Sequence, residues 1–136
     1  MKNNPVLQEI LLIDDNSFIN YLNKNTLLEM GIVKNIHVAY DGFEALKYLK
    51  DCKEKNTMPD LILLDIIMPM VDGTDFIKWV KVLNLLNSST KIIALTGGGY
   101  DARITELKQL GLDEILYKPL DKKHFIEVIQ KLFPNN

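Results

Sequence analysis

The 136-residue chain is long enough for one domain with a sizeable core, and its 47% hydrophobic and 25% charged residues are ordinary for a globular protein. Its formal net charge is −2 and it has no block of basic residues, which argues against nucleic-acid binding by this chain alone. The single cysteine, Cys52, excludes an internal disulfide and a cysteine-based metal site, and we interpret it as a packing residue.

Five apolar segments of strand-like length recur along the chain, and segments of helical periodicity lie between and after them. The predicted strands are 9–14, 35–39, 61–65, 91–96 and 114–118. The first predicted helix runs from Ser17 to Met30 and ends at Gly31, and Trp79 falls on the apolar stripe of the third, where we expect it in the core. This alternation predicts one α/β domain, in which helices cover both faces of a parallel sheet.

The third predicted strand raises a question, because the apolar stretch "LILLDIIMPMVDG" (61–73) has a single aspartate, Asp65, at its centre. An unpaired carboxylate inside a buried strand would be costly. Asp65 alone is best explained as a residue that caps the turn after the strand. The other strand ends change that interpretation.

Polar side chains follow four of the five predicted strands. Asp14 and Asp15 close the first strand, Asp65 the third, Thr96 the fourth and Lys118 the fifth. Because the carboxyl ends of parallel strands meet at one edge of a sheet, we expect three carboxylates, a hydroxyl and an ammonium to lie close together there. Their convergence from distant segments favours a functional role for Asp65 over a turn cap.

Three neighbouring carboxylates repel one another unless protons or a cation intervene. Hard oxygen ligands of this kind suit Mg²⁺, which prefers few carboxylates, several waters and a phosphate partner. A carboxylate beside Mg²⁺ and an ammonium can act as a nucleophile on a phosphoryl group. Lys118 and the metal would then neutralise the transferring oxygens, and Thr96 would donate a hydrogen bond to one of them.

Four motifs together resemble the receiver domain of two-component response regulators. They are "DD" (14–15), "LLDIIMPMVDG" (63–73), "LTGG" (95–98) and "YKP" (117–119), in that family's order and spacing. The resemblance implies a single receiver domain over 1–136 with a core of about 8–132. It also implies a flavodoxin-like (βα)5 fold, a doubly wound five-stranded parallel sheet with strand order 2-1-3-4-5.

The resemblance further implies that Asp65 accepts a phosphoryl group and becomes an aspartyl phosphate. Mg²⁺ would be bound by Asp15, Asp65 and the main-chain carbonyl of Ile67, with Asp14 acting largely through water. Lys118 and Thr96 would contact the phosphoryl oxygens. Pro119 matches a family proline that usually follows a cis peptide bond.

Two departures from the family pattern affect switching and lifetime. Ile115 occupies a position at which many receivers have an aromatic switch residue, so we expect the loop that begins at Gly97 (97–100) to transmit more of the signal. Ile67 and Gly98 lie two residues beyond Asp65 and Thr96, and neither side chain can orient an attacking water. We therefore predict slow hydrolysis of the aspartyl phosphate.

The predicted protein is a stand-alone, chemotaxis-regulator-like receiver without an output domain, which catalyses only its own phosphorylation and dephosphorylation. Its donor would be a sensor histidine kinase or a histidine phosphotransfer protein, and its product a binding state for an unknown protein target. Dimer formation is left open. The sequence has neither a signal peptide nor an apolar run long enough to cross a membrane, so a cytoplasmic location is expected.

Two alternatives to this interpretation fit the sequence less well. A pseudo-receiver would keep the fold as an interaction module without phosphorylation, but such proteins usually lose an acidic residue or the lysine. A small α/β enzyme is the other alternative. A phosphatase of the aspartyl-phosphate type would have a second aspartate where Ile67 stands, and a flavodoxin-like protein would have a Ser/Thr-rich phosphate loop where "DDNSF" (14–18) stands.

Overall fold

The computed structural model describes residues 6–66, 68, 70–97 and 103–134. Strands and helices alternate from one end of the chain to the other, as the sequence predicts. They are β1 Leu7–Ile13, α1 Ser17–Glu29, β2 Val33–Ala39, α2 Gly42–Lys55, β3 Leu61–Asp65, α3 Gly73–Val82, β4 Lys91–Thr96, α4 Arg103–Gln109, β5 Glu114–Tyr117 and α5 Lys122–Leu132.

The strands form one parallel sheet in the order β2-β1-β3-β4-β5, which confirms the predicted topology. In the register, Leu12 of β1 pairs with Val38 of β2 on one side and with Leu63 of β3 on the other. Every residue of β3 is buried, including Asp65. A central parallel strand covered on both faces accounts for the nearly continuous apolar sequence of this segment.

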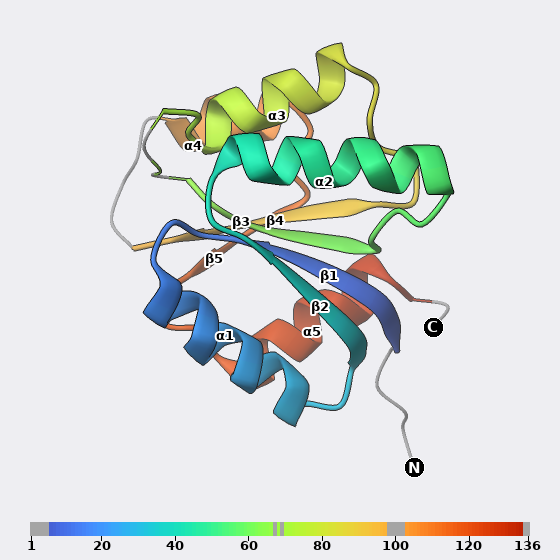
Figure 1. Cartoon of the computed structure of the whole chain (residues 1–136). Coiled ribbons are helices and arrows are strands. Elements are labelled where there is room, and N and C mark those ends of the chain that lie inside the picture. Colours follow the sequence, from blue (N-terminus) through green and yellow to red (C-terminus); the bar gives the residue numbers. More distant parts are fainter. Residues whose placement is uncertain (1–5, 67, 69, 98–102, 135–136) are drawn as a thin grey trace.

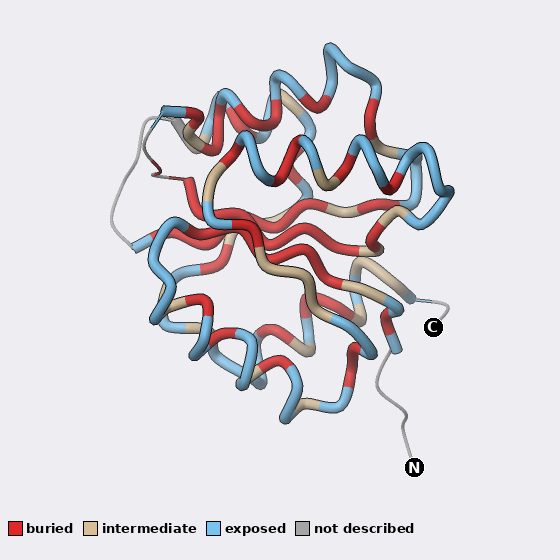
Figure 2. Tube along the Cα trace, viewed as in Figure 1, coloured by how far each residue is buried: buried red, intermediate tan, exposed pale blue. Residues whose placement is uncertain are grey.

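Helices α2, α3 and α4 cover one face of the sheet, and α1 and α5 cover the other (Figure 1). Successive strand residues point to opposite faces, so each strand contributes to two cores. Leu11 and Ile62 belong to the core under α2 and α3, whereas Leu12 and Leu63 belong to the core under α1 and α5. Buried positions accordingly run along the strands and along the inner sides of the helices (Figure 2).

Four helices begin at a polar residue whose side chain accepts a hydrogen bond from the backbone N–H three residues later. These N-cap residues are Asn16, Asp41, Asp72 and Asp121. Asn16 therefore caps α1, which leaves the preceding aspartates available to face the strand edge. Asp72 caps α3, where its Oδ1 accepts a 3.0 Å hydrogen bond from the N–H of Asp75.

Several predicted boundaries differ from the structure by one or two residues. β1 begins at Leu7 and β2 at Val33, α1 ends at Glu29, and β5 ends at Tyr117. The first residues of β1 and β2 include exposed polar residues, namely Gln8, Lys34 and Asn35. Because these residues interrupt the apolar pattern, the sequence predicted later starts for both strands.

Cys52 is buried in the α2 core as expected, whereas the prediction for Trp79 is wrong. The buried positions of α3 are Gly73, Thr74, Phe76, Ile77 and Val80. They form one helical stripe, and Trp79 lies beside it with 50% of its surface exposed.

Candidate functional site

The carboxyl ends of β1, β3, β4 and β5 lie along one edge of the sheet and bring together residues distant in sequence (Figure 1). Asp65 is the last residue of β3 and pairs in register with Leu95 of β4. The backbone N–H of Lys118, just after β5, donates a 2.7 Å hydrogen bond to the carbonyl of Thr96, the last residue of β4. The register of the sheet thus fixes the positions of the strand-end residues Asp65, Thr96 and Lys118 relative to one another.

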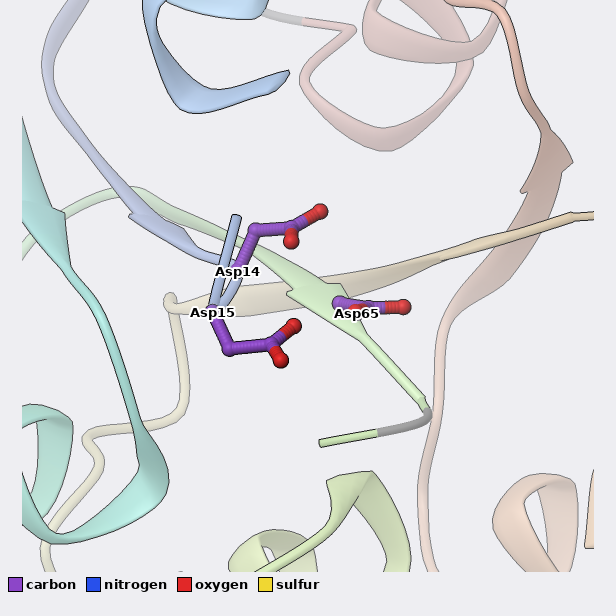
Figure 3. A group of neighbouring side chains, drawn as sticks. All are labelled: Asp14, Asp15 and Asp65. Atoms are coloured by element: carbon purple, nitrogen blue, oxygen red, sulfur yellow. The ribbon is translucent and has the colours of Figure 1, made fainter. Parts of the chain in front are cut away.

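Three carboxylates form a compact cluster at this edge. One oxygen each from Asp14, Asp15 and Asp65 lies within 4.8 Å of the other two. Asp14 and Asp65 are buried, whereas Asp15 is exposed at the mouth of the cluster. Figure 3 shows their side chains extending from the ends of β1 and β3 into a shared space.

Backbone contacts hold Asp14 on both sides. Its Oδ1 accepts a 2.9 Å hydrogen bond from the N–H of Asn16, and its own N–H donates to the carbonyl of Ala39 at 3.2 Å. The buried Asn20 side chain donates from Nδ2 to the carbonyl of Asp14 at 2.7 Å. Asn20 was not predicted as a site residue, because the sequence pattern of α1 does not show that this asparagine is buried.

Lys118, which directly follows β5, also contacts the cluster. Its Nζ lies 3.2 Å from Oδ2 of Asp14 and 3.4 Å from Oδ1 of Asp65, and its side chain is 28% exposed. Burial disfavours the ammonium, but attraction to Asp65 and Asp14 and hydrogen bonds to both outweigh it, so the pKa of Lys118 is raised. Lys118 is therefore firmly charged at neutral pH.

The donor set fits Mg²⁺. Three carboxylates and one ammonium leave the cluster with an excess of negative charge, and every ligand atom it offers is a hard oxygen. A divalent cation would relieve the repulsion between the carboxylates. The main-chain carbonyl of Ile67, the fourth predicted protein ligand, lies outside the described residues.

Gly73, the first residue of α3, permits a close approach between this helix and the chain that follows β3. Its N–H donates a 2.7 Å hydrogen bond to the carbonyl of Ile66. A Cβ at this position would lie 2.8 Å from Cα of Ile66 and 3.1 Å from the carbonyl oxygen of Asp65. Only glycine lets the start of α3 press against the backbone that presents Asp65.

A fold with an acidic cluster and a lysine at the strand ends matches a known family. The family model described as response regulator receiver domain matches residues 10–130. The chain belongs to this family. Receiver domains are signalling modules of two-component systems.

The curated relatives of this receiver domain are larger proteins as well as small ones. It is 29% identical over 126 residues to hybrid signal transduction histidine kinase G of Dictyostelium discoideum, a match that covers 93% of this chain and 4% of the relative. It is 28% identical over 122 residues to the chemotaxis protein CheY of Bacillus subtilis, covering 90% of this chain and 94% of the relative. Apart from CheY, five curated relatives that include kinase G are much longer, and the chain spans between 4% and 33% of their length.

Solved receiver structures share the fold. A receiver domain protein from Clostridium thermocellum is 28% identical with a TM-score of 0.75, and the match covers 94% of this chain and 95% of that one. A response regulator from Cytophaga hutchinsonii, 22% identical, superposes with a TM-score of 0.82 over 96% of this chain and 99% of that one. The latter likeness concerns the fold alone.

Two of the predicted switch positions, Gly97 and Pro119, directly follow the site residues Thr96 and Lys118 in the chain. Thr96 is buried at the end of β4, and Gly97 after it is exposed. Ile115 is half-buried and packs against the α2–α3–α4 core, and the peptide bond between Lys118 and Pro119 is cis, as the resemblance implied. The rest of the predicted switch loop, 98–100, lies outside the described residues, so its role stays a prediction.

Among the residues that the structure describes, no helix is both long and apolar enough to cross a membrane.

Proposed function

We propose that Asp65 accepts a phosphoryl group from a phosphohistidine in a Mg²⁺-dependent reaction. One observation supports this most directly. The Asp65 carboxylate lies within 4.8 Å of two further carboxylates and 3.4 Å from the Lys118 ammonium, at an edge where parallel sheets bind ligands. Two relatives, from Dictyostelium discoideum and Saccharomyces cerevisiae, are named histidine kinases, which supports a histidine-bound donor.

In the proposed reaction, one carboxylate oxygen of Asp65 attacks the phosphorus atom of the donor. An O–P bond forms as the N–P bond to the donor histidine breaks, and the imidazole leaves with the bonding electron pair and takes up a proton. Asp14, Asp15 and Asp65 would hold Mg²⁺, which when bound neutralises charge on the phosphoryl oxygens.

The remaining roles belong to side chains of the site. Lys118 is charged and would donate hydrogen bonds to the transferring oxygens in place of its present contacts with Asp14 and Asp65. Thr96 would donate a further hydrogen bond from the end of β4. Asn20 is a positioning residue, because it acts only through the backbone of Asp14.

The product of the reaction is a protein in a different binding state. Conversion of the Asp65 carboxylate to an aspartyl phosphate adds negative charge beside Lys118 and shifts an equilibrium between two conformations. We propose that a protein target, not a small molecule, distinguishes the two. The donor histidine kinase or phosphotransfer protein is the second expected partner.

Intact-mass measurement after incubation with Mg²⁺ and acetyl phosphate tests the proposal. We expect one added phosphoryl group in the wild type and in Asp51→Asn, which removes an exposed carboxylate of α2, and none in Asp65→Asn. An adduct that persists in Asp65→Asn refutes the assignment. If the wild type accepts no phosphoryl group from acetyl phosphate or from a phosphorylated phosphotransfer protein, the proposal fails and the chain is an interaction module with a receiver fold.

A further inference from the structure

Residues of α2, of α3 and of the turn after α3 line a groove. The two helices lie on the same face of the sheet (Figure 1). The groove has a volume of about 790 Å³, and its lining is mainly apolar. Phe43 and Leu46 line it from α2, Trp79 from α3, and Leu83 and Leu85 from the turn after α3. None of these residues belongs to the acidic site.

Three of the groove's large apolar side chains are half exposed. Phe43 is 49%, Trp79 50% and Leu83 48% exposed. Single exposed apolar residues are normal on a protein surface, but a contiguous group in a hollow marks a binding site more often than chance. The buried stripe of α3 consists of Gly73, Thr74, Phe76, Ile77 and Val80, so Trp79 lies outside it and faces the groove.

The rim of the groove is basic. Lys47, Lys50 and Lys53 line it, against one acidic residue, Glu54. This excess of positive charge contrasts with the net charge of −2 for the whole chain. Lys53 donates a 2.5 Å hydrogen bond from Nζ to the carbonyl of Asn84 and so connects the end of α2 to the turn after α3. Lys47 and Lys50 are exposed.

We propose that this groove binds an acidic amphipathic helix of a partner protein. The 14 residues of α2 span about 21 Å, enough to lie against three to four turns of a second helix. Apolar residues of the partner at i, i+3 or i+4 and i+7 would contact Phe43, Trp79 and Leu83, and acidic residues beside them would pair with Lys47 and Lys50.

Two other occupants fit less well. A second copy of the chain docked through the same groove would place the lysine rims of both copies against each other, and like charges across an interface are costly. A bilayer with anionic lipids would satisfy the lysines. However, a hollow surface between two helices suits a protruding helix better than a flat membrane.

Trp79 is the only tryptophan of the chain and lies in the groove, so its fluorescence reports occupancy directly. The probe is an 18-residue, tryptophan-free helical peptide with leucines spaced three and four residues apart and flanking glutamates. Its charge-reversed twin has lysine for each glutamate. We expect saturable binding of the acidic peptide with a blue shift of Trp79 emission, because burial removes the indole from water.

Matched variants test the role of the rim. Lys47→Gln/Lys50→Gln removes two charges from the groove, and Lys34→Gln/Lys108→Gln removes two exposed charges elsewhere. We expect the groove pair to weaken acidic-peptide binding about tenfold and the control pair to leave it within about twofold. Circular dichroism of each variant checks that the fold is intact.

Several results would overturn the proposal. They are the absence of any shift with the acidic peptide, equal binding of its charge-reversed twin, and equal weakening by the two lysine pairs. A shift that appears only with phosphatidylserine vesicles assigns the groove to membranes, and one that depends on protein concentration alone assigns it to a second copy. The phosphoryl-transfer assay on Asp65 is independent of all these outcomes.

Discussion

Replacement of Gly73 by alanine tests whether close backbone packing presents Asp65. The added Cβ would lie 2.8 Å from Cα of Ile66, where nonbonded carbon atoms normally stay about 3.5–4.0 Å apart. Overpacking of this kind costs about 1–3 kcal/mol, and the 2.7 Å hydrogen bond from Gly73 to Ile66 would weaken as α3 withdraws. The higher helix propensity of alanine offsets at most about 1 kcal/mol.

We therefore expect Gly73→Ala to lower the free energy of unfolding by about 2 kcal/mol, measured by urea denaturation followed through Trp79 fluorescence. Two glycines serve as controls. A Cβ at Gly97 meets no atom within 4 Å, so Gly97→Ala should change the free energy of unfolding by less than about 0.5 kcal/mol. Gly31→Ala is also uncrowded but has φ +68°, and should cost about 1–2 kcal/mol from backbone strain alone.

The same variant should weaken Mg²⁺ binding in calorimetric titrations, because the crowded atoms include the carbonyl oxygen of Asp65. If Gly73→Ala is as stable as Gly97→Ala, the close approach of α3 to the Asp65 segment does not exist as described. A loss of stability with unchanged Mg²⁺ affinity would show that the approach supports the fold without positioning the carboxylate.

Three further predictions concern individual side chains. Lys118→Gln should bind Mg²⁺ about tenfold more tightly, since a repelling charge is removed, yet accept a phosphoryl group about 100-fold more slowly; weaker Mg²⁺ binding in titrations would contradict the electrostatic account. Burial and a hydrogen bond to Glu9 raise the pKa of the Tyr48 hydroxyl above its ordinary 10.0. The folded protein therefore keeps the Tyr48 proton at a pH at which the unfolded chain loses it, and the free energy of unfolding falls as the pH rises past about 10. Tyr48→Phe should show a shallower fall in urea midpoints between pH 9 and 11, and parallel curves would refute this. Ile67→Asn should shorten the lifetime of the aspartyl phosphate, because the amide can orient a water; equal decay rates in the two proteins would count against slow hydrolysis in the wild type.

The architecture was predictable because its main signals are local. The buried strands appear as apolar runs whose length separates them from helices, and their alternation with helical segments leaves few topologies. Asp14, Asp15 and Asp65 could be placed together before any contact was known, since parallel strands end at the same edge. Phosphorylation and metal-binding measurements test the catalytic and metal-binding roles proposed for these residues.

The features that sequence reasoning missed depend on tertiary packing. The burial of Asn20 and its hydrogen bond to Asp14 follow from how α1 lies on the sheet, and helical periodicity alone cannot distinguish that asparagine from an exposed one. The close approach at Gly73 depends on the path of the chain between β3 and α3. Trp79 was predicted in the core because it falls on the apolar stripe of the third helix, but Phe76, Ile77 and Val80 already fill the buried side of α3.

The distribution of charge shows why composition alone says little about partners. The strand edge concentrates Asp14, Asp15 and Asp65 around one lysine, whereas the α2–α3 groove gathers three lysines against one glutamate. These two local charges are opposite in sign, and the net charge of −2 for the whole chain reveals neither of them. Because screening limits charge effects to roughly 10 Å at 0.1 M salt, each surface attracts ligands according to its own residues. The acidic edge therefore suits a cation and the groove suits an acidic partner, although the chain as a whole is almost neutral.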